Sequence, residues 1–251
     1  MCGITGVIGP KGEETIKKMA SVIAHRGPDE DGFYTDENVA LGMRRLSIID
    51  LAGGHQPISS ADERYLIFFN GEIYNYKEIK GELGDYPFKT SSDTEVILAG
   101  FIKWGANDLL NRLRGMFAFA IYDKEKKELF LTRDFFGIKP LYYTKKPFAF
   151  ASEIKSFLAI PEFKPEVNDA AVFNYLSYQY NPLDQTFFKG VYKLPPAHWM
   201  KVNVDTGETE MKRYWQFEFR PIVAKAMTGK QDEEEMKKKI LEVMKDSVAH
   251  H

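Results

Sequence analysis

The chain opens with MCGITGVIG, residues 1–9, and the cysteine of this stretch is the only one among 251 residues. The apolar run that follows, ITGVIG, predicts a short β-strand. Cysteine has a small side chain that permits removal of the initiator methionine, and Cys2 would then be the terminal residue. Its α-amine, with an ordinary pKa of about 7.7–8.0, is suited to accept the proton of a thiol whose pKa is about 8.5. The stretch therefore predicts a nucleophile that carries its own base, with a small buried hydrophobe as the alternative.

The composition indicates a globular protein, because 44% of the residues are hydrophobic and 28% are charged. A formal net charge of -2 gives no electrostatic reason to expect a nucleic-acid or membrane partner. No secretory signal is visible, and no apolar run approaches the roughly 20 residues that span a bilayer. One cysteine forms no internal disulfide, so we expect a reduced thiol in a cytoplasmic protein. The cysteine and the histidines show no paired spacing, so we expect no metal site.

Local patterns predict many short strands and a few helices. The expected helices lie at 13–24, ending at a Gly-Pro break, at 91–105, where Ser92 and Glu95 have capping-box spacing, and at 168–180, beginning at Asn168. The expected strands lie within 32–50, at 65–70, where Asn70-Gly71 is expected to stop the strand, and in pairs at 116–134, 137–152 and 199–215. This pattern favours an α+β fold with antiparallel sheets.

The end of the chain differs in composition from the rest. Residues 228–251 are densely charged and place Met236, Ile240 and Met244 on one side of a predicted amphipathic helix. We therefore expect a main domain over 1–212, a linker over 213–227 and this helix over 228–251.

Other residues supply groups that an amide-cleaving enzyme needs. The side-chain amide of Asn70 and the backbone N–H of Gly71 are suited to an oxyanion hole, although Asn-Gly after a strand is more often a hairpin turn. Arg45 is suited to grip a carboxylate, and Asp93 to accept an ammonium group. Taken singly, a surface arginine and a helix-capping aspartate are the commoner explanations of these two residues.

Several motifs of the chain occur together in a fixed order. They are MCGI (1–4), HRGPDEDG (25–32), RLSIID (45–50), NGEIYN (70–75), SSDTE (91–95), LRGMFAFAIYD (113–123), TRDFFGIKPLYY (132–143), ASEIKSF (151–157) and KLPPAHW (193–199). Over roughly the first 200 residues they resemble class II glutamine amidotransferases, and specifically the glutaminase domain of glutamine-dependent asparagine synthetases. RLSIID resembles this branch rather than the branches that make glucosamine phosphate or phosphoribosylamine. One departure is Ala197, where the resemblance leads us to expect glycine.

The resemblance implies the N-terminal nucleophile hydrolase fold, a four-layer αββα sandwich of two antiparallel sheets. It implies that Cys2 is the nucleophile after loss of Met1, and that Asn70 and Gly71 form the oxyanion hole. The residues implied in glutamine binding are Arg45 at the α-carboxylate, Glu72 and Asp93 at the α-ammonium, and the backbone of Leu46, Ile48 and Ile49 along the pocket.

The implied reaction hydrolyses glutamine to glutamate and ammonia through a γ-glutamyl thioester. In full-length members of the family, ammonia passes through a tunnel to a second domain, where ATP and Mg²⁺ activate aspartate. We therefore expect glutamine and an ammonia-accepting synthetase domain or subunit as partners, with a homodimer left open. We expect no cofactor in this chain, and ATP and Mg²⁺ only in the synthetase domain.

The synthetase half should carry a Ser-Gly-Gly-x-Asp-Ser loop, which this sequence lacks. The helix at 228–251 is then expected to be the start of an absent synthetase domain, and the chain to be either an excised glutaminase domain or a stand-alone glutaminase with a separate ATP-binding subunit. Ammonia supply for asparagine synthesis is the favoured function. The alternatives are amidation or ring closure of another acceptor, and a glutamine-binding module with little turnover.

Overall fold

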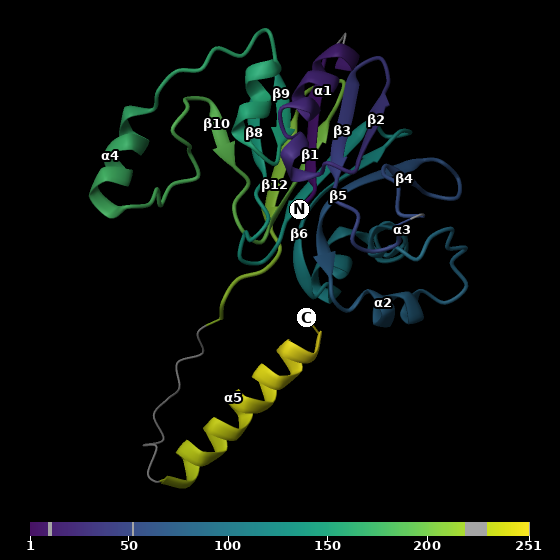
Figure 1. Ribbon diagram of the computed structural model, residues 1–251, viewed down its shortest axis with the longest axis vertical. Coiled ribbons are helices and arrows are strands. Elements are labelled where there is room, and N and C mark those ends of the chain that lie inside the picture. The colour runs from purple at the N-terminus through teal and green to yellow at the C-terminus, as the bar shows by residue number, and fades with distance from the viewer. Residues whose placement is uncertain (10–11, 52, 219–229, 251) are drawn as a thin grey trace. The chain divides into compact units, whose positions relative to one another are not determined.

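The computed structural model describes residues 1–9, 12–51, 53–218 and 230–250, which divide into the units Met1–Trp215 and Gln216–His251. The first unit contains two antiparallel sheets (Figure 1). The first sheet has the strand order β10 (Val191–Lys193), β8 (Tyr142–Lys145), β9 (Phe148–Ala151), β1 (Gly3–Ile8), β3 (Val39–Arg45) and β2 (Glu30–Thr35). The second has the order β12 (Thr209–Arg213), β11 (His198–Asn203), β7 (Glu128–Arg133), β6 (Gly115–Asp123), β5 (Tyr65–Ile73) and β4 (Ile58–Ser59).

Strand alternation divides the side chains of each sheet between its two faces. In β5, Leu66 and Phe68 belong to the apolar cluster between the sheets, whereas Ile67 and Phe69 belong to the cluster on the opposite face. Other strands of both sheets add buried residues to the cluster between them, including Ile4, Leu41, Met43, Ala118, Tyr122, Leu131 and Met200. This shared core holds the two sheets face to face.

Helices cover the outer faces of both sheets. α1 (Gly12–Ser21) packs its buried residues on the first sheet, together with the 3₁₀-helix η2 (Ile154–Ala159). α3 (Asp93–Arg112) packs on the second sheet, with α2 (Tyr76–Leu83) beside it. The order helix, sheet, sheet, helix confirms the predicted αββα sandwich.

Most of the local predictions are confirmed. α1 covers most of the predicted helix at 13–24, and the short η1 (Ala24–Arg26) leads to the Gly-Pro break. The three predicted strand pairs are β6–β7, β8–β9 and β11–β12. α4 (Asp169–Tyr178) begins after Asn168, whose side chain accepts a hydrogen bond from the backbone N–H of Ala171.

The prediction that Asn70-Gly71 stops a strand is wrong. β5 continues through both residues, and its backbone pairs Asn70 with Ala118 and Gly71 with Phe117 of β6. Pairing along the whole of β6 therefore overrides the local turn preference. Glycine is still required at 71, because a Cβ there would collide with the carbonyl oxygen of Met116.

The capping box at the start of α3 is only half formed. The Ser92 hydroxyl accepts a hydrogen bond from the Thr94 N–H at 3.2 Å, as an N-cap does. The Glu95 carboxylate instead accepts hydrogen bonds from the backbone N–H groups of Lys89 and Thr90, at 2.8 and 2.6 Å. Glu95 thus binds the preceding loop and not the Ser92 N–H. The Ser92 N–H donates to the Thr90 hydroxyl instead.

Ala197, where glycine was expected, has a φ of 57°. This left-handed conformation costs a residue other than glycine about 1–2 kcal/mol. Backbone hydrogen bonds hold it there, because its N–H donates to the carbonyl of Asp134 and its carbonyl accepts from the N–H of Tyr214. Glycine adopts this conformation without strain, which is why it was expected here. The two hydrogen bonds hold alanine in the same conformation.

The second unit contains α5 (Lys230–His250), inside the predicted helix at 228–251. Met236, Ile240 and Met244 are all exposed. Much of the predicted linker over 213–227 lies outside the described residues, so the division into three segments stays a prediction. Within the described ranges, no helix combines the length and the apolar character that a membrane span needs.

The core between the sheets generates a stability prediction. Phe68 is 0% exposed, so Phe68→Ala should lower the free energy of unfolding by about 3–5 kcal/mol through lost burial and a cavity. Phe173 on α4 is 70% exposed, and Phe173→Ala should change stability by less than about 0.5 kcal/mol. Urea unfolding of both variants measures the difference, and equal losses would contradict the assignment of the core.

Candidate active site

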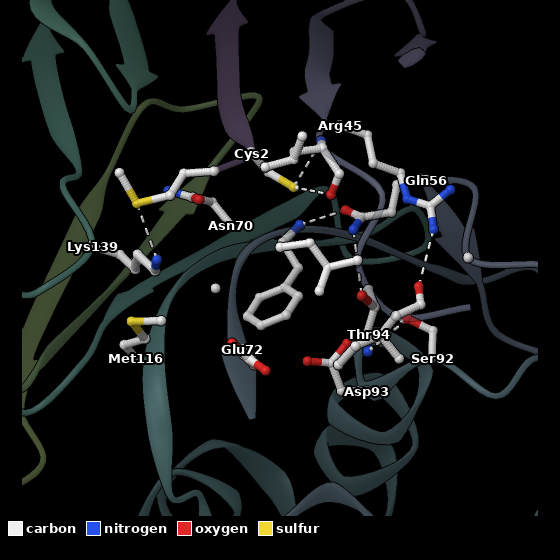
Figure 2. Close-up of a pocket in the computed structure, with 17 residues that line it drawn as sticks. Cys2, Arg45, Gln56, Asn70, Glu72, Ser92, Asp93, Thr94, Met116 and Lys139 are labelled. Atoms are coloured by element: carbon white, nitrogen blue, oxygen red, sulfur yellow. Dashed lines mark hydrogen bonds between the residues drawn. The ribbon is translucent and has the colours of Figure 1, made fainter. Parts of the chain in front are cut away.

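Cys2 lies where β1 meets β3 at one end of the sandwich. The antiparallel register pairs Gly3 with Arg44, which brings Cys2 beside the end of β3. The Cys2 Sγ accepts a hydrogen bond from the Leu46 N–H at 3.4 Å and donates one to the Leu46 carbonyl at 3.6 Å. The thiol is therefore held by the main chain just past β3 (Figure 2).

A pocket of about 110 Å³ opens beside this thiol. All of the residues that the sequence analysis proposed for the site line it: Cys2, Arg45, Leu46, Ile48, Ile49, Asn70, Gly71, Glu72 and Asp93. In Figure 2, Cys2 and Asn70 lie along one side of the pocket, and Glu72 and Asp93 lie along the other. The fold thus brings together Cys2, which precedes β1, the end of β3 with the loop that follows it, β5 and the start of α3.

Asn70 has an unusual environment for a buried amide. It is 0% exposed, and neither its side-chain nitrogen nor its side-chain oxygen has a hydrogen-bond partner among the described residues. An unpaired buried polar group costs about 1–3 kcal/mol, so such groups are rare without a purpose. The amide N–H is consequently free to donate to an oxygen that enters the pocket.

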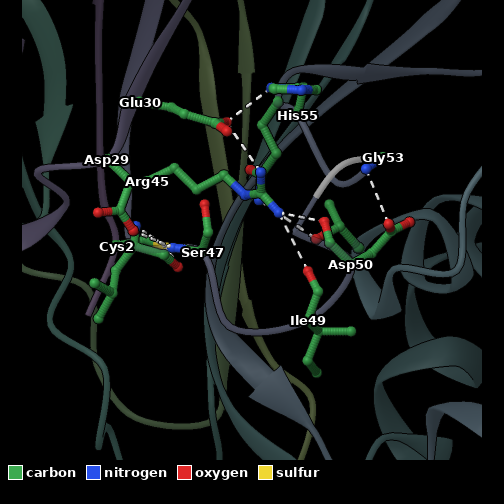
Figure 3. Close-up of polar contacts among 12 residues, drawn as sticks. Cys2, Asp29, Glu30, Arg45, Ser47, Ile49, Asp50, Gly53 and His55 are labelled. Carbon is green, nitrogen blue, oxygen red and sulfur yellow. Dashed lines mark hydrogen bonds and ion pairs between the residues drawn. The ribbon is translucent and has the colours of Figure 1, made fainter.

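Arg45 is almost fully buried, and its guanidinium is held from several directions (Figure 3). One terminal nitrogen donates to the Glu30 carboxylate at 2.9 Å, and the other donates to the carbonyls of Ile49 and Asp50, at 3.2 and 2.8 Å. The same Glu30 oxygen lies 2.8 Å from Nδ1 of His55. Arg45 is thus a pre-positioned cation rather than a mobile surface arginine.

Asp93 lies at the first position of α3 with its side chain 4% exposed. Its carboxylate accepts hydrogen bonds from the Ile73 N–H at 3.1 Å and from the neighbouring Ser92 hydroxyl at 3.4 Å. Burial raises the pKa of Asp93 to about 6, because the charged form loses contact with water. The nearby carboxylate of Glu72 acts in the same direction.

The Cys2 thiol is protonated in this environment. Burial is the main cause that raises its pKa, while the hydrogen bond from Leu46 and the charge of Arg45 act in the opposite direction. A protonated thiol needs a base before it can attack a substrate. Met1 is present in the structure and lines the pocket, so the Cys2 nitrogen is part of a peptide bond here.

The pocket also contains residues that were not singled out from the sequence. Gln56 bridges two walls, because its side-chain oxygen accepts from the Phe69 N–H at 2.7 Å and its amide donates to the Thr94 hydroxyl at 3.4 Å. The other additional lining residues are Gly54, Ser92, Met116 and Lys139. Thr94, Ser92, Met116 and Lys139 fall inside the quoted motifs, which is the signal that would have found them.

Among the described residues, no group of three or more His, Cys, Asp or Glu side chains is arranged to hold a metal ion. The groups that line the pocket are a thiol, an unpaired amide, one held guanidinium, one ammonium and two carboxylates. This arrangement can attack a carboxamide, stabilise an oxyanion, and hold a small molecule that carries both a carboxylate and an ammonium group.

Comparison with known proteins agrees with this chemistry. Residues 1–215 match the family model of a glutamine amidotransferase domain. Over its full length the chain is 41% identical to asparagine synthetase [glutamine-hydrolyzing] 1 of Bacillus subtilis (strain 168), and over 86% of its length it is 40% identical to asparagine synthetase [glutamine-hydrolyzing] 2 of the same organism. It covers 40% and 30% of these two proteins, so it spans less than half the length of these relatives.

The fold also resembles a solved structure. Glutamine phosphoribosylpyrophosphate amidotransferase from B. subtilis, solved with ADP and GMP, superposes with a TM-score of 0.63 at 19% identity. The match covers 86% of this chain and 50% of that chain. At this level of identity the likeness concerns the fold, and it agrees with the αββα arrangement of the sheets.

The raised pKa of Asp93 generates a prediction about stability. The unfolded carboxyl ionises near pH 3.9 and the folded one near pH 6, so the folded state binds more protons between these values. The stabilising contribution of this proton is fully present below about pH 4 and is lost as pH rises through about 6. Relative to Asp93→Asn, the wild-type protein should therefore lose about 2 kcal/mol of unfolding free energy between pH 4 and pH 7.

Urea unfolding at several pH values, carried out on both proteins, measures this difference. Asparagine retains an oxygen that accepts the Ile73 N–H, which makes Asp93→Asn a conservative comparison. A stability difference that stays constant over this pH range would show that Asp93 titrates normally.

Proposed function

The chain belongs to the glutamine amidotransferase domain family, and from this premise we propose that it hydrolyses the side-chain amide of glutamine with Cys2 as the nucleophile. The observation that carries the proposal is the unpaired, fully buried amide of Asn70 in the same pocket as the only thiol. A buried donor without a partner is pre-organised for an oxygen that becomes negative during the reaction. The Gly71 N–H is the second proposed donor.

Loss of Met1 supplies the base. The freed α-amine of Cys2 has an ordinary pKa of about 7.7–8.0, so part of it is neutral near pH 7.5. Because burial keeps the thiol protonated, an adjacent neutral amine is what converts it to a thiolate. The proposed chemistry uses only protein groups and needs no cofactor in this domain.

Each step of the reaction has a proposed proton donor and a proposed proton acceptor. The Cys2 sulfur attacks the amide carbon of glutamine while the thiol proton passes to the terminal amine. The carbon–nitrogen bond then breaks, the amine returns that proton to the leaving nitrogen, and ammonia departs from a γ-glutamyl thioester. Water attacks the thioester with the amine as base, which releases glutamate and restores the thiol.

Charged groups select the substrate in this proposal. Arg45 holds the α-carboxylate of glutamine through guanidinium N–H groups that do not donate to Glu30, Ile49 or Asp50. Glu72 and Asp93 receive the α-ammonium, with Asp93 ionised above about pH 6. Leu46, Ile48 and Ile49 line the space between these ends.

We propose that the ammonia serves asparagine synthesis, as the names of the 40–41% identical relatives suggest. An acceptor domain or subunit, together with ATP and Mg²⁺, lies outside this chain in the proposal. A cytoplasmic location fits the single reduced thiol. Another acceptor remains a second candidate, because a protein of Gibberella zeae that is 34% identical over 98% of the chain is named amidase chry2.

A glutamine-like electrophile tests the nucleophile. We expect such a reagent to add once, at Cys2, in protein whose intact mass shows the loss of Met1. Protein that retains Met1 should react much more slowly, because its Cys2 nitrogen is an amide. Labelling at another residue, or full glutaminase activity with Met1 in place, would overturn the mechanism.

Replacement of the oxyanion donor gives a second test. Asn70→Ala should lower kcat for glutamine hydrolysis by about 10²–10³-fold, with a much smaller change in KM, because the donor acts in the transition state. Asn111→Ala, at an exposed position of α3, is the matched control and should retain wild-type turnover. Unchanged turnover in Asn70→Ala would remove Asn70 from the mechanism.

A further inference from the structure

Lys139 lines the pocket but has no role in the proposed mechanism. It is 4% exposed, and its main chain is fixed on both sides, because its N–H donates to the Asp134 carboxylate at 2.9 Å and its carbonyl accepts from Arg133 at 2.8 Å. This fixed backbone directs the side chain into the pocket (Figure 2). A buried lysine is uncommon, since its charge is costly to remove from water.

The ammonium of Lys139 has a weak partner. Within the described part of the chain, its hydrogen bond is to the sulfur of Met1 at 3.2 Å, and no carboxylate lies within ion-pair distance. A thioether is a poor acceptor, so this contact offsets little of the cost of burial. The positive charge of Lys139 is therefore the feature that needs a functional explanation.

The contact with Met1 places this charge near the terminus that processing creates. Five covalent bonds separate the Met1 sulfur from the Cys2 nitrogen, so the Lys139 ammonium lies within about 10 Å of that nitrogen. Two positive charges at this distance in a partly buried site repel each other appreciably. An ammonium group at the new terminus is thus disfavoured relative to a neutral amine.

We propose that Lys139 is a positioning residue for the nucleophile, whose positive charge keeps the α-amine of processed Cys2 unprotonated so that it can accept the thiol proton. This inference rests on the proposed function, because it assigns the amine as the base. The structural basis is the buried ammonium that lines the same pocket as Cys2 and contacts Met1.

Neighbouring cations are already paired with carboxylates, which distinguishes them from Lys139. Arg26 of η1 donates to the Cys2 carbonyl at 2.9 Å but pairs with Glu153, which also contacts His25 and Lys155. Arg45 of β3 pairs with Glu30, which also contacts His55. Each of these arginines has a carboxylate partner, whereas Lys139 has none within ion-pair distance among the described residues.

Three carboxylates act in the opposite direction. Glu72 of β5 and Asp93 of α3 line the pocket, and a negative charge there favours a protonated amine. Asp134 accepts backbone hydrogen bonds from residues including Phe117 and Lys139, and lies behind the Lys139 backbone. Of the two pocket cations, Arg45 and Lys139, Lys139 is the one without a carboxylate partner among the described residues, and its charge counters these carboxylates.

The pH dependence of glutamine hydrolysis tests this inference. Lys139→Gln and Lys139→Met remove the charge, and each should shift the acidic limb of kcat/KM to higher pH by about 0.5–1 unit, while activity at high pH is retained. Lys139→Arg keeps the charge and should keep the wild-type limb. Intact mass establishes Met1 removal in every protein, and urea unfolding identifies any variant that does not fold.

A direct titration of the amine needs no glutaminase activity. In a Cys2→Ala background, Met1 is also removable, and a short pulse of acetic anhydride at each pH measures the neutral fraction of the terminal amine. The midpoint should rise by about 0.5–1 unit when Lys139→Gln or Lys139→Met is added, but not with Lys139→Arg. If no protein hydrolyses glutamine and this shift is still seen, the proposed function fails while the role of the charge stands. Unchanged midpoints, or an equal shift in Lys139→Arg, would overturn the inference.

Discussion

The antiparallel ladder between β1 and β3 is the constraint on which the site depends. Its register pairs Gly3 with Arg44, so the residue before β1 lies beside the residues that follow β3. Cys2 is thereby placed against the main chain of Leu46, next to the buried guanidinium of Arg45. β1 also pairs with β9 on its other side, which makes it an inner strand of its sheet. A terminal residue is usually free to fray, but here Cys2 adjoins an inner strand and its thiol is hydrogen-bonded to the main chain of Leu46.

The sequence predicts the helices and strands that depend on local signals. It does not predict features that depend on pairing or packing with residues far away in the chain. The hairpins β6–β7 and β11–β12 follow from apolar runs around a turn, and the start of α4 follows from Asn168. The Asn70-Gly71 turn signal wrongly predicted the end of a strand. β6 pairs with β5 across both residues, and β6 lies about fifty residues away in the sequence. The nine proposed site residues all line one pocket. Five of them were suggested by their chemistry, and the order of the motifs added Leu46, Ile48, Ile49 and Glu72. Charge and spacing alone did not single out Lys139, Glu30 or Gln56, since their positions depend on long-range packing.

The site concentrates polar groups that reduce stability. Asn70, Asp93 and Lys139 are each at most 4% exposed as whole residues, and their polar groups lose hydration that the protein only partly replaces. The three apolar clusters between and outside the sheets are what offset this loss. Strain is likewise tolerated nearby at Ala197, where backbone hydrogen bonds to Asp134 and Tyr214 hold a left-handed residue. A rigid sandwich is therefore a requirement for the proposed chemistry, because a softer core would let water reach and satisfy these groups.

The charged groups at the two ends of the pocket are arranged in different ways. At the Arg45 end, Glu30 already offsets the guanidinium charge, and two main-chain carbonyls fix its orientation. A substrate carboxylate would gain from the fixed orientation of the remaining guanidinium N–H groups more than from net charge. At the other end, no ion pair among the described residues involves Glu72 or Asp93, so their negative charge is available to an ammonium group. An amino acid whose α-ammonium enters between these carboxylates would help to keep Asp93 ionised, since a nearby cation lowers the pKa of a carboxyl group. In the proposed function, substrate binding would therefore bring the α-ammonium against Glu72 and Asp93 and the α-carboxylate against Arg45.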